Sequence, residues 1–169
     1  MSEALPKQIQ ILPIAEEHIE DFHKCLDIVA RERLYLAAVE APPLAATRDF
    51  VLSSLANDTP QFVARLNHVV IGWCDISPHQ WEGFQHSGQL GMGVHPEYRR
   101  LGIGRQLVVQ TIQKAKAKGL ERIELEVFAS NALAIGLYEK LGFLIEGRKK
   151  RARKLDGNYD DIIEMALFV

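Results

Sequence analysis

A glycine-rich turn in the second half of the chain carries the clearest chemical signal. It reads Arg99-Arg100-Leu101-Gly102-Ile103-Gly104, and apolar residues at helical spacing follow it. The first N–H groups of a helix have no acceptor within the helix, and glycines let an anion approach them closely. Three arginines, Arg99, Arg100 and Arg105, add positive charge around the turn. These residues predict a binding site for a phosphate or pyrophosphate group.

Three phosphate-binding motifs have glycines at similar spacing. A Walker A loop requires Lys and then Ser or Thr after its last glycine, whereas Arg105-Gln106 follows Gly104 here. A dinucleotide fingerprint requires a third glycine where this chain has Leu107, and it starts directly after a strand. The pattern R/Q-x-x-G-x-G/A fits without change. The glycines alone would also suit an ordinary helix start with solvated arginines.

Two segments resemble signatures of the GNAT superfamily of N-acetyltransferases. Val94 to Gly104 resembles its acetyl-CoA signature, and Asn131 to Phe143 resembles its second signature, N-x-x-A-x-x-L-Y-x-x-x-G-F. The resemblance is clear from about Gly88 to the end of the chain. It implies an enzyme that transfers acetyl from acetyl-CoA to a primary amine of a small molecule, amino acid or peptide. The amine would attack directly in a ternary complex. Leu155–Asp161 resembles the hairpin of a bacterial branch of the superfamily that includes amino-acid N-acetyltransferases.

The resemblance also implies roles for individual residues. Backbone groups around the second half of the strand Gly88–Val94 would pair with pantetheine, and the turn would hold the pyrophosphate. Asn131 would reach the pantetheine arm or cap the last helix, and Tyr138 would give a proton to the departing thiolate. The expected cofactor-binding residues are Met92, Gly93, Val94, Arg99, Arg100, Leu101, Gly102, Ile103, Gly104, Arg105 and Asn131.

The general base and the acceptor site stay open at this stage. Many relatives carry an acidic residue near the position of Gln89, which cannot accept a proton. An ordered water, an amine that is already neutral, or another carboxylate would have to serve. The carboxylates considered are Glu40, Glu126 and Asp161. The acceptor is expected between the first two helices, at Tyr35–Pro43, and in the last hairpin, at Lys154–Asp161.

Periodicity predicts one domain, 1–169, with the element order β-α-α-β-β-β-α-β-α-β-β. The resemblance implies the GNAT fold, an α/β (α+β) architecture. Its mixed, mostly antiparallel sheet has six to seven strands with a splayed central pair, and about four helices accompany it. The expected strands are Gln8–Ile14, Gln61–Leu66, Val69–Ile76, Gly88–Val94, Glu121–Phe128, Phe143–Glu146 and Ile162–Val169. The expected helices are Glu16–Ile28, a segment capped by Thr47 that runs to Leu55, a helix through Ile103–Ala115 that ends at Gly119, and Asn131–Leu141.

Composition narrows the classes of function. The chain has 169 residues and a formal net charge of -2, which provides no general attraction to nucleic acid or to an anionic membrane. We expect no leader in Met1–Gln10, no membrane span and a cytoplasmic location. The two cysteines are expected to be buried thiols, and the scattered histidines indicate no metal site. The basic run Arg148–Lys154 lacks the interleaved aromatic residues of a nucleic-acid platform and is expected to be a solvated strand end or loop.

Two alternatives remain. A domain of the same fold could bind or sense acyl-CoA without turnover, although the turn, Asn131 and Tyr138 are all present. Many members of the superfamily pair through their terminal strands, so the resemblance also allows a homodimer.

Overall fold

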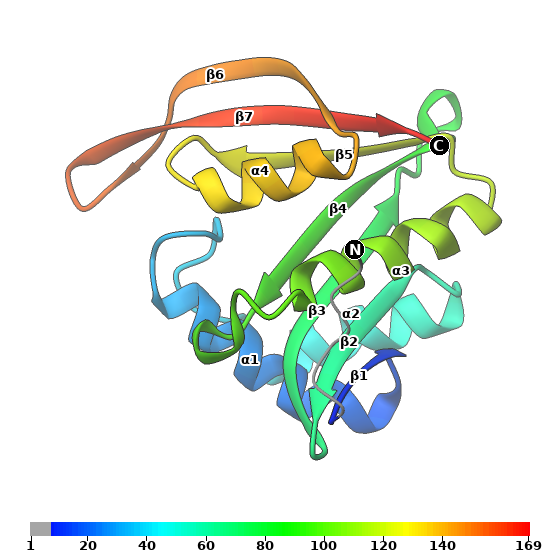
Figure 1. Ribbon diagram of the computed structural model, residues 1–169. Coiled ribbons are helices and arrows are strands. Elements are labelled where there is room, and N and C mark those ends of the chain that lie inside the picture. Colours follow the sequence, from blue (N-terminus) through cyan, green and yellow to red (C-terminus); the bar gives the residue numbers. More distant parts are fainter. Residues whose placement is uncertain (1–7) are drawn as a thin grey trace. The chain divides into compact units, whose positions relative to one another are not determined.

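The computed structural model describes residues 8–169 (Figure 1). The element order agrees with the sequence prediction, apart from three short 3-10 helices that periodicity did not indicate. The first seven residues, on which part of the expectation of no leader rests, lie outside the described part. The strands are β1 (Ile9–Pro13), β2 (Gln61–Leu66), β3 (Val69–Pro78), β4 (Ser87–Val94), β5 (Arg122–Phe128), β6 (Leu144–Leu155) and β7 (Asn158–Phe168). The helices are α1 (Ile19–Arg31), α2 (Leu44–Ala56), α3 (Ile103–Ala117) and α4 (Ala132–Lys140).

The chain forms two compact units. The first contains the residues up to Ser77 and Gly91–Lys118, and the second contains Pro78–Leu90 and Gly119–Val169. Strand β4 therefore begins in the second unit and ends in the first. The seven strands are mostly antiparallel, which confirms the predicted fold class. Across residues 8–169, none of the helices combines the length and the apolar character that crossing a bilayer requires.

The first unit has a core on each face of its strands. Strands β1, β2 and β3 pair antiparallel in chain order, and α1 and α2 cover one face. The Phe22 ring of α1 meets the Trp73 ring of β3 edge to face, with 5.6 Å between their centroids. On the other face α3 packs against the strands through fully buried side chains such as Leu107 and Val108. These layers fix the end of β4 and the start of α3.

The second unit contains a parallel strand pairing, between β4 and β5. The pairing of β4 with β5 covers three residue pairs and stops at Gln89 and Glu124, as a splayed central pair requires. β7 pairs antiparallel with β5 on one side and with β6 on the other. The long β6–β7 hairpin closes at Asp156-Gly157, and both residues have positive φ.

Several predicted elements are wrong in extent. Helix α1 covers Ile19–Arg31 rather than Glu16–Ile28, and strand β7 begins at Asn158 rather than Ile162. Helix α2 begins at Leu44, because Pro43 serves as its N-cap and accepts bonds from the N–H groups of Ala46 and Thr47. Thr47 is therefore a buried residue inside the helix rather than its cap. Strand β6 runs to Leu155 and includes the basic run, because its cations pair with carboxylates on neighbouring strands. The sequence alone did not show which carboxylates would lie opposite.

Gly93 provides a test of the packing between β3 and β4. A Cβ atom at Gly93 would lie 2.2 Å from the Trp73 ring, which is buried in the α1/α2 core and cannot move away. We expect Gly93→Ala to lower the free energy of unfolding by about 2–4 kcal/mol, measured by urea denaturation. Gly91→Ala is the matched control, since its Cβ would be no closer than 3.8 Å to any atom. Equal losses in the two variants would contradict this packing.

Candidate functional site

The glycine turn lies between the end of β4 and the start of α3. After Val94, the N–H of His95 donates to the Ile71 carbonyl at 2.8 Å, which holds the end of β4 beside β3. A single 3-10 turn, Pro96–Tyr98, then leads into the turn. Arg100 has φ 62° and Gly102 has φ 80°, so the backbone twice enters the left-handed region before α3 begins. These two left-handed residues turn the chain between the end of β4 and the start of α3.

The start of α3 presents N–H groups that have no acceptor inside the helix. The first bond of the ladder runs from the Gln106 N–H to the Gly102 carbonyl, at 3.1 Å, so the N–H groups of residues 103–105 precede it. The Ile103 side chain is fully buried and anchors the first turn. A Cβ at Gly102 would meet no atom within 4 Å, so this side of the turn is open. The arrangement suits an anion.

The three arginines of the turn have different surroundings. The Arg99 Nε donates to the Val94 carbonyl at 3.0 Å, and its two terminal nitrogens donate to the Glu32 carboxylate at 2.8 and 2.5 Å. The same guanidinium stacks on Tyr35, 4.8 Å from the ring centroid. This side chain is thus held by protein groups, whereas Arg100 and Arg105 are exposed. Of the three, Arg100 and Arg105 have side chains available to a ligand.

Asn131 and Tyr138 lie in the second unit, at the start and near the end of α4. The Asn131 side chain accepts the Ala134 N–H at 3.2 Å and so caps α4, one of the two roles considered for it. Tyr138 is buried, and its ring lies 5.5 Å from that of Phe143 between centroids. The backbone carbonyl of Tyr138 accepts from Leu141 and Phe143, which fixes the end of the helix.

The three carboxylates considered as general base are all paired with cations or N–H groups. Glu40 lies 3.4 Å from Arg31, and Glu126 pairs with Lys149. Asp161 accepts from the Arg151 N–H at 2.7 Å and from the Arg148 Nε at 2.6 Å. These bonds, the backbone one first, hold the pKa of Asp161 below its ordinary value. Paired carboxylates of this kind are weak proton acceptors at neutral pH.

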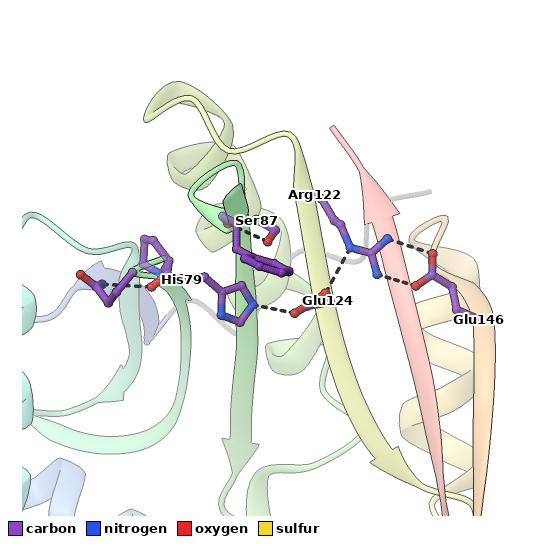
Figure 2. A network of polar contacts seen from close by, with 8 residues as sticks. His79, Ser87, Arg122, Glu124 and Glu146 are labelled. Atoms are coloured by element: carbon purple, nitrogen blue, oxygen red, sulfur yellow. Dashed lines mark hydrogen bonds and ion pairs between the residues drawn. The ribbon is translucent and has the colours of Figure 1, made fainter. Parts of the chain in front are cut away.

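A chain of polar contacts occupies the position opposite Gln89 (Figure 2). Glu124, which lies beside Gln89 in the parallel register, accepts from His79 at 2.6 Å and from Arg122 at 3.1 Å. Arg122 also forms a two-pronged pair with Glu146. Burial acts to raise the pKa of Glu124, but the hydrogen bonds from His79 and Arg122 outweigh it and lower the pKa. Glu124 is therefore held as an ionised, structural carboxylate.

Asp75 on β3 is a carboxylate that sequence reasoning missed. It is partly buried, and burial raises its pKa to about 7. Within residues 8–169 its oxygens form no hydrogen bond or ion pair. Both oxygens lie 3.8 Å from the position of a Cβ at Gly91, the residue just before Met92–Val94. The signal available in the sequence was a lone Asp in the apolar strand around Trp73-Cys74-Asp75-Ile76.

The structure also places the two cysteines and the start of the expected acceptor segment Tyr35–Pro43. Cys25 and Cys74 are buried free thiols, as predicted, and burial raises the pKa of both, that of Cys25 to about 12. In the described part of the chain, no three His, Cys, Asp or Glu side chains come together as metal ligands. The stacking of Tyr35 on Arg99 brings the start of the α1–α2 connection to the glycine turn.

Comparison with known proteins agrees with this architecture. Residues 19–143 match the model of the acetyltransferase (GNAT) family. The chain is 29% identical to the L-amino acid N-acetyltransferase AaaT of Escherichia coli K12, over 90% of this chain and 95% of that protein. It is 40% identical to the [ribosomal protein bS18]-alanine N-acetyltransferase of the same organism, but that match covers 46% of this chain and 53% of the relative.

Solved structures share the fold. The acetyltransferase yncA from Salmonella typhimurium, solved with its cofactor acetyl-CoA, superposes with a TM-score of 0.89 at 18% identity, over 96% of this chain and 94% of that one. An acetyltransferase of the GNAT family from Streptococcus pneumoniae gives the same TM-score at 23% identity. The family model matches most of the chain, so the protein belongs to the acetyltransferase (GNAT) family.

Asp75 gives the stability of this protein an unusual dependence on pH. Because burial raises its pKa in the folded state, folding favours the protonated form. The carboxylate therefore costs nothing below about pH 4, costs more as the pH rises to about 7, and costs a constant amount above that. We expect Asp75→Asn to stabilise the protein at pH 8 by on the order of 2 kcal/mol and to have little effect at pH 4.

Chemical denaturation at a series of pH values measures this difference. The exposed Asp49 of α2 provides the control, since Asp49→Asn removes the same charge from the surface. A stability difference between Asp75→Asn and the original protein that stays constant from pH 4 to pH 8 would contradict the burial of the Asp75 charge.

Proposed function

We propose that this protein is an acetyl-CoA-dependent N-acetyltransferase that acts on the primary amine of an amino acid, a peptide or another small molecule. The observation that carries the proposal is the turn Arg99–Gly104, whose left-handed residues open the start of α3 to an anion. Membership of the GNAT family supports the use of an acetyl donor. The proposal covers residues 1–169 as one acetyltransferase domain, with the cytoplasm as its location.

In this proposal the turn holds the pyrophosphate of acetyl-CoA. The N–H groups of residues 103–105 donate to it, together with backbone groups of Arg100 and Leu101, and the exposed Arg100 and Arg105 contribute charge. Because the Arg99 side chain is held by Glu32 and Val94, Arg99 would contact the cofactor through its backbone. The backbone of Met92–Val94 would pair with pantetheine, and Asn131 would meet the pantetheine arm while it caps α4.

The chemical step needs a neutral amine, a polarised thioester carbonyl and a proton for the thiolate. An N–H group near Met92–Val94 would polarise the carbonyl. Tyr138 would donate the proton as the thiolate departs, for which its place in the signature Asn131–Phe143 is the support. The nitrogen–carbon bond forms as the carbon–sulfur bond breaks, and the nitrogen keeps one hydrogen in the product amide.

The names of the relatives support an α-amino group as the acceptor. AaaT is named for L-amino acids, and the bS18 enzyme is named for an alanine of a ribosomal protein. The first of these matches spans nearly the whole of both chains. A free L-amino acid is therefore the first acceptor class to test, followed by a peptide that begins with alanine.

Release of free thiol from acetyl-CoA tests the proposed activity. The protein is mixed with acetyl-CoA and, in separate reactions, with L-amino acids, an alanine-terminated peptide, polyamines and aminoglycosides. We expect at least one amine to accelerate thiol release, with L-amino acids the strongest. If acetyl-CoA binds and no amine accelerates release, the alternative of a non-catalytic acyl-CoA-binding module replaces this proposal.

Tyr138→Phe tests the proposed acid. The substitution keeps the ring that packs on Phe143 and removes only the hydroxyl. We expect kcat to fall by about 10²-fold or more while the affinity for acetyl-CoA changes little. Equal losses of kcat and of acetyl-CoA affinity in Tyr138→Phe would argue against an acid role.

A further inference from the structure

Asp75 of β3 stands out among the acidic side chains near the glycine-bearing strand. The other carboxylates considered, Glu40, Glu126 and Asp161, are each bound by cationic groups, and Glu124 is held by His79 and Arg122. Asp75 has no hydrogen-bond or ion-pair partner among residues 8–169. A carboxylate without partners is expensive to keep in a partly buried position. The cost calls for a reason.

The position of Asp75 relates it to the cofactor strand. Its two oxygens lie 3.8 Å from the site of a Cβ at Gly91, so the carboxylate faces the backbone of β4 at this point. Gly91 has no side chain to cover the carboxylate, and it directly precedes Met92–Val94. Two residues farther along, Gly93 lies against Trp73, which is on the same face of β3 as Asp75. β3 and β4 are therefore held close together next to this carboxylate.

The residues that face Asp75 supply no compensating charge. On β2 the directly opposite residue is Gln61, whose side-chain nitrogen and oxygen are buried and form no hydrogen bond within residues 8–169. On β4 the facing residue is Gly91. The next residue toward the start of β3, Cys74, is a buried thiol that carries no charge. The α3 residue that contacts Cys74 is the uncharged Thr111. Desolvation is accordingly the sole cause of the raised pKa of Asp75.

We propose that Asp75 is the proton acceptor of this acetyltransferase, in place of the acidic residue that is absent at Gln89. The proposal rests on the proposed function and deepens it. In the step, the Asp75 carboxylate takes one proton from the acceptor ammonium group, and the neutral amine then attacks the thioester carbon. The nitrogen–carbon bond forms, the carbon–sulfur bond breaks, and the second proton lost by nitrogen is balanced by the proton that the thiolate gains. Asp75 returns its own proton to solvent.

The chemistry of a partly desolvated carboxylate suits this task. A base works best when its pKa lies near the operating pH, and burial has brought that of Asp75 to about 7. The carboxylates bound by arginine or lysine lack this property, because their cations stabilise the charged form. The same burial makes Asp75 a cost to stability, as is common for groups that serve a reaction.

Variants of Asp75 are tested by the pH profile of turnover. The probe is acetyl-CoA with an equimolar mixture of L-amino acids as acceptor, without cysteine because its own thiol would be detected, and thiol release is followed from pH 5.5 to 9. Because the bound ammonium group gives its proton to Asp75, only Asp75 must be ionised before attack in the original protein, so the logarithm of the rate should rise with a slope of about one and level off above about pH 7. In Asp75→Asn the amine must instead lose its proton to solvent, so the rise should continue through pH 8 toward the pKa of the amine, and the rate at pH 8 should fall about 10²-fold or more.

Controls separate a catalytic role from a structural one. Asp75→Glu should restore part of the rate and a plateau near neutral pH, whereas Asp49→Asn should leave the whole profile unchanged. The affinity of Asp75→Asn for acetyl-CoA, measured by calorimetry, should match that of the original protein, which also shows that the variant is folded. A normal rate and an unchanged plateau in Asp75→Asn would overturn the assignment and leave the proposed function standing. Absence of thiol release in the original protein would overturn the proposed function, and the assignment with it.

Discussion

The contacts of the Arg99 guanidinium group are the interactions on which the geometry of the first unit depends. It donates to the Val94 carbonyl at the end of β4, forms a two-pronged pair with Glu32 just after α1, and stacks on Tyr35 in the α1–α2 connection. Three segments that are far apart in the sequence thus meet at one side chain. A lysine could not make these contacts, since its ammonium is a single point of charge.

The carboxylates near the sheet differ in whether a cationic group pairs with them. Most acidic side chains near the sheet have a cationic partner, as in the chain that links His79, Glu124, Arg122 and Glu146. Such pairs hold protons in place and fix strand positions. Within residues 8–169 Asp75 has no such partner, and its charge is opposed only by desolvation. The charge of Asp75 beside Gly91 of β4 therefore lowers the stability of the protein.

The sequence predicted the elements and their order, because period and turn residues act locally. It predicted the glycine turn for the same reason, and the family resemblance gave the capping of α4 as one of two roles for Asn131. It missed what depends on pairing between distant segments. The full length of β6 required knowing which carboxylates face its cations. Arg99 is bound by Glu32, which lies 67 positions away in the sequence. Asp75 likewise faces Gly91, a residue 16 positions away that has no side chain to pair with it.

The proposed acetyl-CoA site depends on the turn before α3, and binding of acetyl-CoA to matched glycine variants tests it most directly. Gly102 and Gly119 lie at opposite ends of α3 with φ of 80° and 91°, and an added side chain would meet no atom within 4 Å at either position. Gly102→Glu and Gly119→Glu therefore impose similar backbone strain. Calorimetry should show about 100-fold or greater loss of acetyl-CoA affinity in Gly102→Glu and little change in Gly119→Glu. Undiminished binding of acetyl-CoA by Gly102→Glu would contradict the proposal that this turn holds the pyrophosphate.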